Sequence, residues 1–111
     1  MVRRDPNIFY HVTPVSNLQS IRHDGLVPQI GPRAIVLGEK RPMVFLFRNM
    51  DDVENAISNW LGEELEDAGE LALVEVTLPI EMRRKRVAFE TQVFDTIPPR
   101  FLRVESEDYG A

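Results

Sequence analysis

An apolar run at residues 8–13 has the two-residue period of a β-strand. Phe9, His11 and Thr13 share one face of this predicted strand, and the residues between them share the other. A helix is expected next, because Ser16 is a favoured N-cap residue and Gly25 can end a helix in a left-handed conformation. His11 and Thr13 therefore lie where a strand ends and a helix begins, which is a common location for a small-molecule site.

The middle of the chain predicts a long connection, a buried strand and an amphipathic helix. Proline and glycine interrupt residues 27–42, within which 35–37 could form a short strand. Residues 43–47 are continuously apolar, which indicates a buried strand. A helix should open at the acidic residues 51–52 and end at Gly62, with a buried face of Val53, Ala56, Ile57, Trp60 and Leu61. The acidic residues 63–70 then predict a solvated loop or a frayed turn.

The last part of the chain is rich in strand patterns. Residues 71–78 predict a central strand, and residues 87–94 predict another in which Glu90 and Gln92 share one face. The basic residues 83–86 fall in the expected turn between them, and residues 101–104 predict a final strand before a loose tail at 105–111. Because helices come early and strands come late, the pattern favours an α+β domain with a mixed or split sheet.

Composition is that of an ordinary globular domain. The chain has 111 residues, enough for one core; 43% are hydrophobic, 28% are charged, and the net charge is −5. It contains no cysteine, which excludes disulfides, thiolate metal sites and a cysteine nucleophile. No apolar run reaches the roughly 18 residues of a membrane helix, and there is no signal-peptide pattern. We therefore expect a single cytoplasmic domain over residues 1–111, with its core at about 8–104 and no membrane partner.

Candidate chemical groups are few. The sequence has no nucleotide-binding glycine loop, no G-x-S-x-G motif and no H-E-x-x-H motif, and with two histidines no metal site is expected. The groups that remain are His11, Thr13, Glu90 and Gln92. Glu90 lies either on the wet face of an edge strand or in a buried position with a partner or a purpose, because burying an unpaired carboxylate is costly.

Basic residues occur in two places, and each has two interpretations. Arg33 and Arg41 in the long connection could bind a phosphate or could be ordinary solvated arginines. The cluster at 83–86 could be a solvated turn or a contact for a polyanion. The negative net charge argues against binding nucleic acid mainly through a broad basic surface.

Several stretches, in this order and spacing, together resemble the ADP-ribosyltransferase superfamily. They are YHVT at 10–13, GLVP at 25–28, RPMVFLF at 41–47, FETQV at 89–93 and IPPRFL at 97–102. The likeness is to small bacterial branches that include the tRNA 2′-phosphotransferases and the DNA-modifying toxins, and it covers most of residues 8–104.

The resemblance implies a split, mostly antiparallel β-core with two main helices, which holds NAD between two half-sheets. His11 would bind the nicotinamide-side ribose, because a neutral imidazole offers one donor and one acceptor, and Thr13 would help to hold the ribose or the amide. Glu90 and His11 would be the catalytic residues, with Glu90 as the carboxylate that stabilises the positive charge developing as nicotinamide leaves. The other residues implied in NAD binding are Arg33, Arg41, Phe45, Phe47 and Gln92.

Some positions depart from the family pattern. Val12 stands where a small residue often follows the histidine, and a phenylalanine stands where the second strand commonly has a hydroxyl. Gln92 stands where arginine-specific members have a second glutamate. A protein that has kept the cleft and lost the chemistry is consistent with these departures.

Three functional hypotheses therefore stand side by side. The first is an ADP-ribosyltransferase that uses NAD and modifies an unknown macromolecular acceptor, either protein or nucleic acid. The second is a non-catalytic module of the same fold that binds NAD, ADP-ribose or a protein. The third is an interaction protein whose acidic residues 63–70 bind a basic partner, in which case binding would depend strongly on salt.

Overall fold

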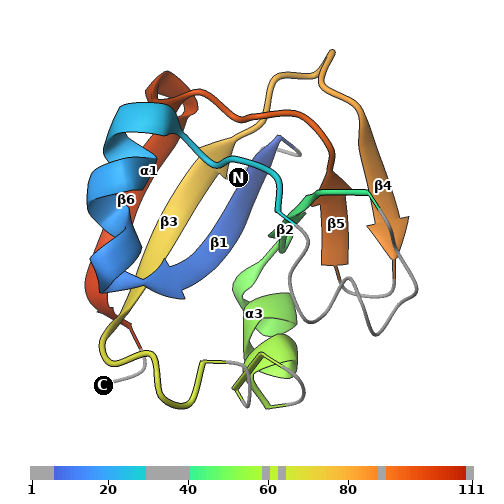
Figure 1. Ribbon diagram of the computed structural model, residues 1–111. Coiled ribbons are helices and arrows are strands. Elements are labelled where there is room, and N and C mark those ends of the chain that lie inside the picture. Colours follow the sequence, from blue (N-terminus) through green and yellow to red (C-terminus); the bar gives the residue numbers. More distant parts are fainter. Residues whose placement is uncertain (1–6, 30–40, 59–60, 63–64, 88–89, 110–111) are drawn as a thin grey trace, which may run out of the picture.

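The computed structural model describes residues 7–29, 41–58, 61–62, 65–87 and 90–109. The predictions for Arg33, for the strand at 35–37 and for Trp60 lie outside these ranges. The described part of the chain has an α+β fold with two antiparallel three-stranded sheets (Figure 1). None of its helices has the length and apolar character needed to cross a membrane.

The two sheets are built from strands that are distant in sequence. The first sheet has the order β1 (Ile8–Pro14), β3 (Leu71–Thr77), β6 (Leu102–Tyr109), and the second has the order β2 (Val44–Leu46), β5 (Glu90–Val93), β4 (Arg84–Val87). The sheets meet where Tyr10 and Phe47 form an isolated antiparallel bridge, with N···O distances of 2.7 and 2.8 Å. β4 and β6 are therefore the outer strands of the whole array.

The predicted alternation of β1 is confirmed. Phe9 packs in one hydrophobic cluster and Val12 in another, so successive side chains enter opposite sides of the sheet. The register with β3 places His11 opposite Val74 and Thr13 opposite Ala72. His11 and Thr13 thus lie on the same face as Phe9, at the end of β1 that leads into the first helix.

The helices differ from the prediction at their ends. A 3₁₀ turn at Val15–Asn17 precedes α1 (Leu18–Asp24), so Ser16 lies in the turn and is not the N-cap residue. Gly25 ends α1 as predicted, with φ at 82°. α3 (Met50–Ile57) starts with the side chain of Asn49 accepting from the Asp52 N–H at 2.7 Å. It ends at Ile57 and not at Gly62.

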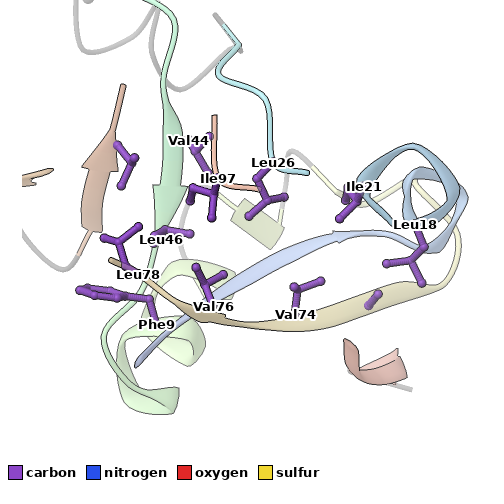
Figure 2. Packing of buried hydrophobic residues seen from close by; sticks show 12 residues of the cluster. Phe9, Leu18, Ile21, Leu26, Val44, Leu46, Val74, Val76, Leu78 and Ile97 are labelled. Atoms are coloured by element: carbon purple, nitrogen blue, oxygen red, sulfur yellow. The ribbon is translucent and has the colours of Figure 1, made fainter. Parts of the chain in front are cut away.

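Two hydrophobic clusters form the core. The first joins both sheets to α1, because Val44 and Leu46 of β2 pack with Val74 and Val76 of β3 and with Leu18 (Figure 2). The second lies under α3 on the other face of β1 and combines Val12, Phe47, Val53, Ala56, Leu61 and Leu73. Leu65, from the stretch predicted to be a solvated loop, packs against this second cluster.

The C-terminal third of the chain differs from the prediction in two places. Residues 87–94 are not one strand, because β4 and β5 pair as antiparallel neighbours with Arg84 opposite Val93 and Val87 opposite Glu90. The basic cluster therefore lies largely on β4, not in a turn. Residues 105–109 are not a loose tail, because β6 continues to Tyr109 and pairs with β3 as far as Leu71.

Candidate functional site

A cavity of about 810 Å³ lies beside the junction of the two sheets. It is bounded by the end of β1, by α1 and the segment after it, by β2 with its flanking residues, and by Leu61, Leu65 and Ala68. Its lining includes His11, Thr13, Asn17, Asp24, Phe45 and Phe47. The volume falls in the range typical of small-molecule sites.

His11 is tied to the neighbouring sheet. Its Nδ1 lies 3.0 Å from the carbonyl oxygen of Phe45, which is 34 residues away in sequence. A carbonyl can only accept, so Nδ1 carries the hydrogen and Nε2 is left as an acceptor. Burial lowers the pKa of His11 below its ordinary 6.5, although the bond to Phe45 acts in the opposite direction. The imidazole is therefore neutral at pH 7 and offers a ligand a hydrogen-bond acceptor.

Thr13 is buried, and its hydroxyl is oriented by Asn17. The Nδ2 of Asn17 donates to the Thr13 Oγ1 over 3.1 Å. The hydroxyl oxygen is thus engaged as an acceptor, and its own hydrogen remains to donate to a ligand in the cavity. His11 and Thr13 together provide one acceptor and one donor on adjacent positions of the same strand face.

Glu90 and Gln92 lie in the middle of the second sheet. The interpretation of Glu90 as a residue on a wet edge is wrong, because β5 is the central strand and both side chains have 0% exposure. Gln92 is directly opposite Phe45 on one side and Lys85 on the other. Directly opposed residues share a face of a sheet, so Phe45, Glu90 and Gln92 lie on one face.

The cavity and the buried pair on β5 are separate in this structure. Neither Glu90 nor Gln92 is among the described residues that line the cavity. Among the described residues, neither Nε2 nor Oε1 of Gln92 has a hydrogen-bond partner. A buried amide without a partner costs about 1–3 kcal/mol.

The remaining site candidates have different environments. Phe45 is half-buried and lines the cavity, whereas Phe47 is buried in the second core cluster and contributes only part of the wall. Arg41 is exposed, and its guanidinium carbon lies 4.3 Å from the centre of the Phe94 ring. It does not line the cavity among the described residues.

The sequence did not single out four polar residues of the cavity, namely Asn17, Ser20, Asp24 and Gln29. Asn17 and Asp24 belong to α1 and its approach, and both face the cavity. The spacing of Asn17 four residues after Thr13 was the only signal for their hydrogen bond. Asp24 bonds to the exposed His23, whose Nδ1 lies 2.6 Å from the Asp24 Oδ1. Within the described ranges, no group of three or more His, Cys, Asp or Glu side chains could hold a metal ion.

Comparison of the sequence with protein-family models and with curated proteins found no match. Function is therefore inferred from the residues and their arrangement.

Proposed function

We propose that the protein is an ADP-ribosyltransferase that binds NAD in the cavity and transfers ADP-ribose to a macromolecule. The observation that carries this proposal is the bond from His11 to the Phe45 carbonyl. It fixes the imidazole at the junction of two three-stranded sheets and leaves Nε2 as an acceptor. Two such sheets, joined at Tyr10 and Phe47, are compatible with a split β-core of the ADP-ribosyltransferase type.

The chemistry of the cavity wall suits the nicotinamide riboside part of NAD. Nε2 of His11 would accept from a ribose hydroxyl, and the Thr13 hydroxyl would donate to the ribose or to the carboxamide oxygen. The half-buried ring of Phe45 would pack against the nicotinamide ring. All three side chains line the same cavity.

Transfer would proceed by exchange at the ribose C1′ carbon. The bond from C1′ to the nicotinamide nitrogen breaks, and its electron pair goes to that nitrogen, so neutral nicotinamide leaves. A lone pair of the acceptor forms the new bond to C1′, and the acceptor proton is released to a base. Positive charge develops on the ribose during this exchange, and a carboxylate in a dry site stabilises it strongly.

Glu90 is the carboxylate assigned to this role. It is buried on the face of the sheet that carries Phe45, and it lies two residues from Gln92, the direct neighbour of Phe45. Diagonal neighbours on adjacent strands are about 7–8 Å apart, within reach of a long side chain. Thus Glu90 lies one diagonal step from a residue of the cavity wall.

A second candidate function is a non-catalytic module that binds NAD or ADP-ribose. It is favoured by one observation, namely that Glu90 is not among the described residues lining the cavity. In that case His11 and Thr13 would bind the ligand, and Glu90 would have a structural role inside the second sheet.

The test is nicotinamide release from NAD by the wild type and by Glu90→Gln, with and without a lysate that supplies acceptors. Loss of the carboxylate charge should lower release by roughly 100-fold or more, while thermal unfolding shows that the fold survives. Glu81→Gln, which changes an exposed glutamate, is the matched control and should release nicotinamide like the wild type. A thermal shift with NAD but no release would favour the binding module. If the wild type shows neither a thermal shift nor release, both functions are refuted.

A further inference from the structure

The outer strand β4 and the residue before it carry a row of cations. Arg83, Lys85 and Arg86 are exposed and are called here the β4 cationic edge. Arg84 is different, because its guanidinium donates to the backbone carbonyls of Pro79 and Met82. Arg84 therefore has a structural role, and the other three cations remain directed to solvent.

The cations of the edge are not ion-paired within the described residues. None of Arg83, Lys85 and Arg86 forms an ion pair or hydrogen bond with another described side chain. The other outer strand, β6, differs in this respect: Arg103 lies 2.9 Å from Glu75 and 2.7 Å from Glu105. Charges of either kind can protect an edge strand from pairing with another chain.

The other outer strand, β6, carries mainly acidic charges, namely Glu105, Glu107 and Asp108. The described acidic residues of β6 lie on the outer strand opposite β4, and the two strands are at opposite ends of the molecule (Figure 1). A net charge of −5 therefore coexists with a local positive potential along β4. This potential would attract a polyanion to one end of the molecule.

The cationic edge adjoins the face that carries Glu90. Lys85 is opposite Gln92, on the face of β5 that carries Glu90. The ladder ends with Arg84 opposite Val93, and Phe94 follows Val93 directly, so Phe94 lies next to this end of the edge. The exposed Arg41 stacks on the Phe94 ring at 4.3 Å.

We propose that the β4 cationic edge binds the phosphate backbone of single-stranded nucleic acid. Three cations in four consecutive residues suit the regular charge of a phosphate chain. The stacked Phe94 and Arg41 add an aromatic and guanidinium surface on which an unpaired base can stack. A duplex cannot use that surface because its bases are already stacked. Any role of the bound strand as acceptor of ADP-ribose rests on the proposed function, whereas the binding does not.

The test is fluorescence anisotropy of a labelled, mixed-sequence single-stranded DNA oligonucleotide titrated with the full chain at several KCl concentrations. Three phosphate contacts predict a slope of log K against log [KCl] of about −2, since each contributes about −0.7 on a single strand. The triple variant Arg83→Gln, Lys85→Gln, Arg86→Gln should bind at least about tenfold more weakly at low salt and lose most of this slope.

A matched control is available on the rest of the surface. The triple variant Arg22→Gln, Arg100→Gln, Arg103→Gln removes the same number of positive charges from exposed positions in the other half of the molecule. It should retain the wild-type slope and bind within about twofold of the wild type. The unlabelled duplex of the same sequence should compete less well than the single strand.

Two results would overturn the inference. One is the absence of oligonucleotide binding by the wild type at low salt. The other is an equal loss of binding affinity in both triple variants, which would indicate that binding responds only to net charge. The titration needs no NAD, and Glu90→Gln should bind like the wild type. Nicotinamide release without oligonucleotide binding would therefore refute only the proposed role of the β4 cationic edge. Oligonucleotide binding without nicotinamide release would refute only the proposed transferase activity.

Discussion

Replacement of Gly25 by alanine should test how the segment after α1 is fixed against the rest of the fold. Gly25 has φ at 82° and ψ at −165°, a region that only glycine adopts readily. An added Cβ would lie 2.1 Å from the carbonyl oxygen of Ile97 and 3.2 Å from the Cα of Pro98. Both are backbone atoms, so no side chain can rotate to relieve the contact.

The expected loss of stability has two parts. Backbone strain at this φ and ψ costs about 1–3 kcal/mol. Leu26 and Ile97 exchange two backbone hydrogen bonds of 3.0 Å next to the clash, and losing them costs about 1 kcal/mol each. Alanine also lowers the conformational entropy of the unfolded chain, which offsets this loss of stability by about 0.4–1 kcal/mol. Gly25→Ala should therefore lower the free energy of unfolding by about 3 kcal/mol.

Gly69 provides the matched control because it has a similar φ of 77° and no atom within 4 Å of an added Cβ. Gly69→Ala should lower the free energy of unfolding by only about 1 kcal/mol, from backbone strain alone. Urea denaturation followed by far-UV circular dichroism measures both variants. Equal losses would refute the contact between Gly25 and Ile97 as the cause.

Two other predictions concern His11 and the start of α3. The folded pKa of His11 is lowered from 6.5, so the unfolded chain binds more protons, and the contribution of this residue is complete above pH 6.5 and lost as the pH falls below it. His11→Gln should flatten the decline in urea stability below pH 6.5, and an unchanged decline would contradict the assignment. Asn49→Ala removes the cap bond to the Asp52 N–H and should cost about 1 kcal/mol in thermal or urea unfolding. A variant as stable as the wild type would mean that this cap contributes nothing.

The strands with a clear period could be predicted from the sequence. Residues 8–13 alternate, 43–47 are continuously apolar, and 71–78 are bounded by Pro79, and each became a strand within a residue or two. Gly25 also ended α1 as expected. These predictions succeeded because the signal lies within each segment and does not depend on distant contacts.

The β4–β5 pair could not be predicted because its sequence lacks a turn signal. Residues 87–94 contain no glycine, proline or asparagine, and they continue one alternating pattern. Without the turn, the sequence offers β5 no partner on that side, so a wet edge remained one of the two interpretations of Glu90. The pairing with β4 makes β5 central and buries Glu90.

The second half of the final strand and the contact between His11 and Phe45 could not be predicted, for a related reason. Residues 105–109 are mostly charged, yet alternate residues of β6 are half-buried against β3, and the tertiary pairing outweighs the weak strand propensity. The bond of His11 to Phe45 joins residues 34 apart. The local pattern identifies His11 as a candidate site residue and Phe45 as part of a buried strand, but only the fold brings the two residues together.

The junction at Tyr10 and Phe47 has a mechanical consequence. Within each sheet, a ladder of bonds resists bending, so each sheet behaves as a stiff plate. Among the described strands, β1 and β2 are joined by that single bridge and by the His11 side chain. The first hydrophobic cluster also packs across both sheets, so the bridge and this shared core together hold the two plates as one rigid frame. A ligand that touches His11 on one plate and Phe45 on the other would therefore meet a gap of preset width, and its fit to that gap would decide whether it binds.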